Sequence, residues 1–169
     1  MTTFPRIGPA IFCLPVVVLL LTISPARAEH FEIHLTVSSA ADTAMAFADT
    51  NTPERPQGFK PRPVCKAKAG EELTFQFFFQ SNFPHDPIKN VTVRYYIVPQ
   101  AKVASDKVPG RENAVMQGNF VLDFKPTTGK VGLRQRLTIA TPGVYLVRVE
   151  SENSDSDHEH FSALDLVVE

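Results

Sequence analysis

Pro142-Gly143-Val144-Tyr145-Leu146-Val147-Arg148-Val149 is the stretch that decides the fold of this chain. A Pro-Gly turn opens it, and hydrophobic residues then recur at every second position, which is the side-chain period of a β-strand. Turn-forming Ser, Asn and Asp residues gather in Glu150–Asp157, and a second alternating stretch, Phe161–Val168, follows. The pattern predicts an antiparallel hairpin that ends an all-β domain.

The same alternation occurs throughout the preceding chain. It is clearest where Leu73, Phe75, Phe77 and Phe79 share one face of a strand. Strands are expected at Glu29–Val37, Thr43–Ala48, Val64–Lys68, Leu73–Gln80, Val91–Ile97, Phe120–Phe124 and Leu133–Ile139, with Pro99 ending the fifth and a loop at Gln100–Gln117. No amphipathic helix pattern competes with them. The sequence therefore predicts one antiparallel β-sandwich of about 7–9 strands.

The first 28 residues have the pattern of a signal peptide. Arg6 precedes the apolar run Ala10–Ile23, and Ala26-Arg27-Ala28 has the small-x-small form of a cleavage site. We expect residues 1–28 to be removed and residues 29–169 to form one domain that is periplasmic, extracellular or on the cell surface, with no membrane span. An uncleaved N-terminal anchor is the alternative, although the run is short for a span.

Charge and cysteine content narrow the class of protein. Removing residues 1–28 leaves 15 Lys and Arg against 18 Asp and Glu, a formal charge of −3. This argues against a nucleic-acid partner, which requires a basic excess. Cys65 is then the single cysteine, so an intramolecular disulfide is excluded. A small residue within a strand is the favoured interpretation of Cys65, and a free thiol or a bond to another chain remain alternatives.

The stretch Gly143-Val144-Tyr145-Leu146-Val147-Arg148-Val149 resembles a strand of immunoglobulin-like and fibronectin-III-like domains. The resemblance implies an Ig-like sandwich in which the Tyr145 hydroxyl bonds back to the backbone of the turn that contains Gly143, as a tyrosine corner. The chain departs from antibody domains because it has no Trp and no cysteine pair. Such a fold resemblance implies no particular activity.

The histidines form two close pairs that predict a metal site. His30 and His34 share a strand face with Glu32 between them, and His158 and His160 share another. Residues two apart on a strand are about 6.5–7 Å apart, which lets two imidazoles converge on one metal ion. If the first and last strands lie side by side, both pairs meet at one end. The hypothesis is a Cu or Zn site, with Glu32 and Asp157 as further ligands or orienting groups. Solvated polar strand faces are the alternative.

Catalytic motifs are missing from the sequence. It contains no Gly-x-Ser-x-Gly elbow, no His-Glu-x-x-His and no Gly-rich phosphate loop. We therefore expect an exported non-enzymatic binding or accessory module that contacts a protein or surface partner through its loops Asn82–Asp86, Gln100–Gln117 and Glu150–Asp157. An exported metal-binding protein that uses the clustered histidines is the second hypothesis, and a zinc-dependent hydrolase is the third.

Overall fold

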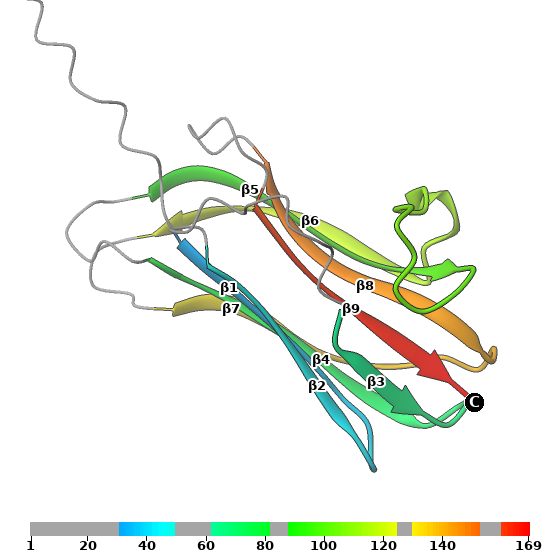
Figure 1. Ribbon diagram of the computed structural model, residues 1–169. Helices are drawn as coiled ribbons and strands as arrows, with labels where there is room; N and C mark the ends of the chain where they lie inside the picture. Colours follow the sequence, from blue (N-terminus) through cyan, green and yellow to red (C-terminus); the bar gives the residue numbers. More distant parts are fainter. Residues whose placement is uncertain (1–30, 50–61, 82–87, 125–129, 153–159) are drawn as a thin grey trace, which may run out of the picture.

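The computed structural model describes residues 31–49, 62–81, 88–124, 130–152 and 160–169, and these form two β-sheets (Figure 1). The strands are β1 (Phe31–Ser38), β2 (Thr43–Asp49), β3 (Val64–Ala67), β4 (Glu72–Ser81), β5 (Ile88–Gln100), β6 (Met116–Phe124), β7 (Lys130–Thr138), β8 (Gly143–Glu152) and β9 (His160–Val168). Sheet A has the order β2-β1-β4-β7 and sheet B the order β3-β9-β8-β5-β6. All neighbours are antiparallel except β3 and β9.

The described part of the chain is all-β, as the sequence predicts. In the part of the chain that the structure describes, helix is limited to the 3-10 turn η1 (Arg111–Asn113). No helix there is long and apolar enough to cross a membrane.

One hydrophobic core lies between the facing sheets. The alternating residues of β1, β4, β8 and β9 turn one side inward and bury it. Phe77 of β4 is central, because its ring lies 5.4 Å from Tyr95 and 6.0 Å from Phe120 between ring centroids, and both of these belong to sheet B. Aromatic contacts between β4 and the β5–β6 pair therefore join the two sheets.

The C-terminal hairpin forms in the register that pairs Gly143 with Val168 and Ser151 with His160. The turn before it is closed by Tyr145, whose hydroxyl donates a hydrogen bond of 2.7 Å to the carbonyl oxygen of Thr141. The ring of Tyr145 is buried in the core. This side chain therefore ties the turn before β8 to the interior.

Tyr145→Phe is expected to lower the free energy of unfolding by about 1 kcal/mol, because it removes one hydrogen bond from a buried site and keeps the ring. Urea denaturation measures the change. Tyr95→Phe is the matched control, since Tyr95 packs against the same core. A loss below about 0.3 kcal/mol for Tyr145→Phe would show that the hydroxyl contributes nothing.

The expectation that Pro99 ends its strand is wrong. β5 continues through Pro99 to Gln100, and Pro99 lies opposite Tyr145 of β8. β6 pairs with β5 only as far as Ile97. One side of Pro99 therefore has no neighbouring strand, and a proline is tolerated at such an edge.

The expectation that the first and last strands lie side by side is also wrong. β1 is bonded to β2 and β4 in sheet A, whereas β9 is bonded to β3 and β8 in sheet B. Both hydrogen-bonding edges of β1 are thus occupied, and β1 cannot pair with β9. The two strands nevertheless begin at the same end of the molecule (Figure 1).

Ser162 carries a buried hydroxyl that lacks a hydrogen-bond partner in the described part of the chain. Among the residues described, its Oγ is the buried side-chain polar atom that lacks a hydrogen-bond partner. Ser162→Ala is expected to leave the free energy of unfolding unchanged or to raise it by up to about 1 kcal/mol, because an unpaired buried hydroxyl is removed. Thermal denaturation tests this, and a clear loss of stability would mean that the hydroxyl is paired in solution.

Candidate binding face

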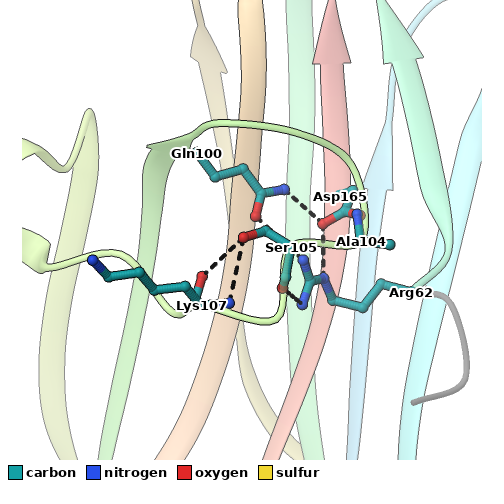
Figure 2. A network of polar contacts seen from close by, with 6 residues as sticks. All are labelled: Arg62, Gln100, Ala104, Ser105, Lys107 and Asp165. Carbon is teal, nitrogen blue, oxygen red and sulfur yellow. Dashed lines mark hydrogen bonds and ion pairs between the residues drawn. The ribbon is translucent and has the colours of Figure 1, made fainter. Parts of the chain in front are cut away.

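The outer face of sheet B is covered. Tyr96, Val98 and Leu146 point away from the main core, yet they are buried in a second small cluster with Ala163. The loop of residues 101–115, between β5 and β6, lies over this face and is bonded to it at several points (Figure 2). The loop therefore covers the middle of this face, and exposed apolar side chains remain at Val121 and Phe161.

A fully buried carboxylate anchors the loop. Asp165 of β9 is 0% exposed, and its Oδ1 accepts hydrogen bonds of 2.7 Å from Arg62 Nε and 2.7 Å from Gln100 Nε2. Its Oδ2 accepts a bond of 2.6 Å from the backbone N–H of Ala104, and Arg62 Nη1 donates to the Ser105 carbonyl oxygen at 3.1 Å (Figure 2). These polar groups pair with one another, so the network holds the loop in place and does not serve as a binding site.

The backbone conformation of the loop depends on this anchor. Ala104 has a φ of 54°, in the left-handed region that costs a residue with a Cβ about 1 kcal/mol. The bond from its N–H to Asp165 offsets that cost. We define these contacts of Arg62, Gln100, Ala104, Ser105 and Asp165 as the loop anchor.

A second network, of hydrogen bonds and a cation–π contact, lies on sheet B. Arg148 Nε donates to Glu150 Oε2 at 2.7 Å, and the Arg148 guanidinium lies 3.9 Å from the ring centroid of Phe161. The Tyr96 hydroxyl donates to the same Glu150 oxygen at 3.4 Å. Burial raises the pKa of Tyr96 to about 12, so this hydroxyl stays protonated near neutral pH.

The outer face of sheet A is open by comparison. Phe47, His34, Phe78 and Gly132 lie opposite one another on β2, β1, β4 and β7, and we name these four residues the aromatic row. His34 stacks on Phe78 with ring centroids 4.2 Å apart and meets the edge of Phe47 at 4.7 Å. Phe47 is 55% exposed, and Met45 beside it is 69% exposed. The exposed apolar side chains of this face thus lie on β2.

Gly132 allows β7 to lie close to β4. A Cβ at Gly132 would collide with the carbonyl oxygen of Phe77, so a larger residue would push β7 away from β4.

Charged groups surround the aromatic row. Glu32 Oε2 lies 3.0 Å from His34 Nε2, and the Lys130 ammonium lies 4.6 Å from the ring centroid of Phe78. Arg134 and Arg136 are exposed further along β7, and Arg136 forms a 3.4 Å ion pair with Glu72. The face is therefore apolar along β2 and cationic along β7.

The structure bears only partly on the predicted metal residues. His30, His158 and Asp157 lie outside the described residues. His34 and Glu32 are neighbours on the outer face of sheet A, whereas His160 begins β9 in the opposite sheet. Within the described ranges, no group of three or more His, Cys, Asp and Glu side chains could hold a metal ion.

Cys65 is a buried free thiol, not an exposed one. Its side chain is 0% exposed in β3, and burial, with a smaller effect of the Asp42 carboxylate, raises its pKa. A thiol of this kind is a poor nucleophile. Its place in the strand agrees with a packing role.

Of the three loops expected to meet a partner, only one is described completely. Residues 101–115 are held by the loop anchor, and Glu150–Glu152 belong to β8. Residues 82–86 and 153–157 lie outside the described residues. The sequence pattern does not predict the aromatic row. Its one signal there is Phe78, which interrupts an otherwise polar strand face.

Comparisons with known proteins find distant structural similarities only. The sequence matches no protein family, and no curated protein matches it either. The PmoD soluble domain from Methylocystis sp. ATCC 49242 (Rockwell) is similar at 14% identity and a TM-score of 0.42, over 81% of this chain and 90% of that chain. No function is carried over from a similarity of this size.

Two further solved structures have similar scores. A chitin binding domain from Burkholderia pseudomallei matches at 13% identity and a TM-score of 0.40, over 70% of this chain and 62% of that one. A family 123 glycoside hydrolase from Clostridium perfringens matches at 13% and 0.40, over 81% of this chain but 27% of the hydrolase.

Proposed function

We propose that this protein is an exported, non-enzymatic binding module and that the outer face of sheet A binds a partner protein. The exposure of Met45 and Phe47 beside the aromatic row is the observation that carries the proposal. Aromatic, Met and Arg side chains are enriched where proteins bind one another. All three kinds lie on this face.

The face of the sheet replaces the loops as the proposed contact surface. The loop of residues 101–115 uses its backbone and polar groups in the loop anchor, so it is less free to bind a partner. The aromatic row keeps the exposed ring of Phe47 on β2, and Arg134 is exposed on β7, at the other edge of the same sheet.

Site-specific photocrosslinking in the exported fraction of the source cells tests this function. A benzophenone side chain at Met45 is expected to capture one partner, and Arg134→Glu in the same chain is expected to weaken capture. The same probe at Val121, which is 63% exposed on β6 of sheet B, is the matched control. Equal capture from Met45 and Val121, or capture from Val121 alone, would contradict the proposal.

The proposal includes the Ig-like type of the fold and the removal of residues 1–28. The hydrogen bond from Tyr145 to Thr141 supports the first, because a tyrosine corner makes such a bond. N-terminal sequencing of the exported protein tests the second. The expected first residue is Glu29, and a sequence that begins at Met1 would contradict it.

Metal binding is the second candidate function. The contact between Glu32 and His34 resembles the carboxylate–histidine pairs that orient metal ligands, and β1 and β9 begin at the same end of the molecule (Figure 1). His30, His34, His158 and His160 would bind Cu or Zn there, with Glu32 and Asp157 as further groups. Metal analysis of purified protein supplied with either ion tests this. Stoichiometric metal that is lost on His34→Ala and on His160→Ala supports it, and no uptake contradicts it.

A further inference from the structure

β2 is an edge strand: in the described parts of the chain it pairs with β1 alone, and the other edges are β7 in sheet A and β3 and β6 in sheet B. β3 touches only its start, where Asp42, just before β2, is bonded to Cys65 and Lys66. An edge strand presents unpaired N–H and C=O groups to any chain that can pair with it. Proteins therefore usually protect such edges.

The other edges carry features that oppose pairing, and in β2 the one such feature is the charge of Asp49 at its last position. β7 has exposed Lys130, Arg134 and Arg136, and β3 is four residues long and includes exposed Lys66. β6 carries exposed Asp123. From Thr43 to Ala48, β2 contains neither a charged residue nor a proline. It is the edge best suited to strand pairing.

We propose that β2 pairs antiparallel with β2 of a second copy of this chain, across a two-fold axis at Ala46. In this register Met45 lies opposite Phe47 of the second copy, and the symmetry repeats the pair. Both side chains are on the outer face, where directly opposed residues have Cβ atoms about 4.5–5.5 Å apart. Thioether–aromatic contacts are favourable at that separation.

The residue order of β2 favours a copy of itself over an unrelated strand. With the axis at Met45, Phe47 would face Thr43, and with the axis at Phe47, Met45 would face Asp49. Only the axis at Ala46 matches both apolar residues and opposes no like charges. An interface whose halves are the same patch is the kind that closes as a two-fold dimer.

The dimer would be weak. One edge strand per copy buries less than the roughly 1,200 Å² typical of stable complexes, so we expect dissociation in the micromolar range. Pairing would join two copies of sheet A into one eight-stranded sheet and place two aromatic rows on one surface. This inference goes beyond the proposed function and does not depend on it.

Sedimentation equilibrium of the purified protein, over about 1–500 μM, tests the dimer. We expect a monomer–dimer equilibrium that Met45→Lys and Phe47→Lys each weaken by about tenfold or more. Val121→Lys is the matched control, because Val121 is similarly exposed on the edge strand of the other sheet. Circular dichroism confirms that each variant is folded.

A mixture of Met45→Cys chains and Phe47→Cys chains tests the register. In the proposed register the two introduced thiols would face each other on the exposed face, at a separation that suits a disulfide, so mild oxidation should yield a covalent dimer of the two variants. The unsubstituted protein, which keeps the buried thiol of Cys65, is the control. A monomer at every concentration, a dimer that Phe47→Lys leaves unchanged, or no cross-link between Met45→Cys and Phe47→Cys chains would overturn the proposal.

Discussion

Replacing Asp165 with alanine is expected to lower the free energy of unfolding by about 3–5 kcal/mol. The carboxylate is fully buried and accepts three hydrogen bonds, and its loss leaves the Arg62 guanidinium without the opposite charge that neutralises it. The bond that stabilises the left-handed backbone at Ala104 is lost as well. Urea denaturation measures the loss, and amide hydrogen exchange at Ala104 should become much faster.

Asp123→Ala is the matched control for this prediction. Asp123 is an exposed carboxylate on the same sheet, and it accepts one hydrogen bond of 3.0 Å from the Asn90 N–H. Its removal should cost about 1 kcal/mol or less. Similar losses for the two variants, or unchanged exchange at Ala104 in Asp165→Ala, would show that the loop anchor does not hold residues 101–115 in place.

Phe77→Ala is expected to cost about 3–5 kcal/mol. Phe77 is buried and lies within 6.0 Å, between ring centroids, of Phe75, Phe79, Tyr95 and Phe120. Its truncation would leave a cavity between the two sheets that the surrounding strands cannot close. The chemical denaturation midpoint and the thermal midpoint should both fall.

Phe78→Ala provides the comparison, since Phe78 is the next residue on β4 and faces outward. Its ring contacts His34 and Lys130 at a partly exposed position, so we expect a loss of about 1–2 kcal/mol. A loss of stability for Phe78→Ala equal to or above that for Phe77→Ala would mean that Phe78, and not Phe77, faces the core.

The sequence was sufficient to predict the strands, because buried and exposed residues alternate along each of them with a period of two. Phe75, Phe77 and Phe79 are all buried, as their spacing predicts, and the last hairpin forms between β8 and β9. The hydrogen bond of Tyr145 is also present. These features depend on residues that are close together in the chain or that share one strand.

Pairing between distant strands could not be predicted in the same way. The alternating pattern of β1 fits pairing with β9 as well as it fits pairing with β2 and β4. The sequence contains no signal that separates these choices. For the same reason, Phe47, His34 and Phe78 could not be recognised as neighbours. Asp165 looked like an ordinary polar strand residue, because its partners Arg62 and Gln100 are far from it in sequence.

Hydroxyl-radical footprinting of the protein with and without its captured partner is the most direct test of the proposed binding face. It should be done at a concentration that keeps the chain monomeric. We predict that Met45 and Phe47 react rapidly in the free protein and are protected in the complex, while Val121 and the loop of residues 101–115 change little. Protection of Val121 or of that loop, with Met45 and Phe47 still reactive, would contradict the proposal that sheet A binds the partner.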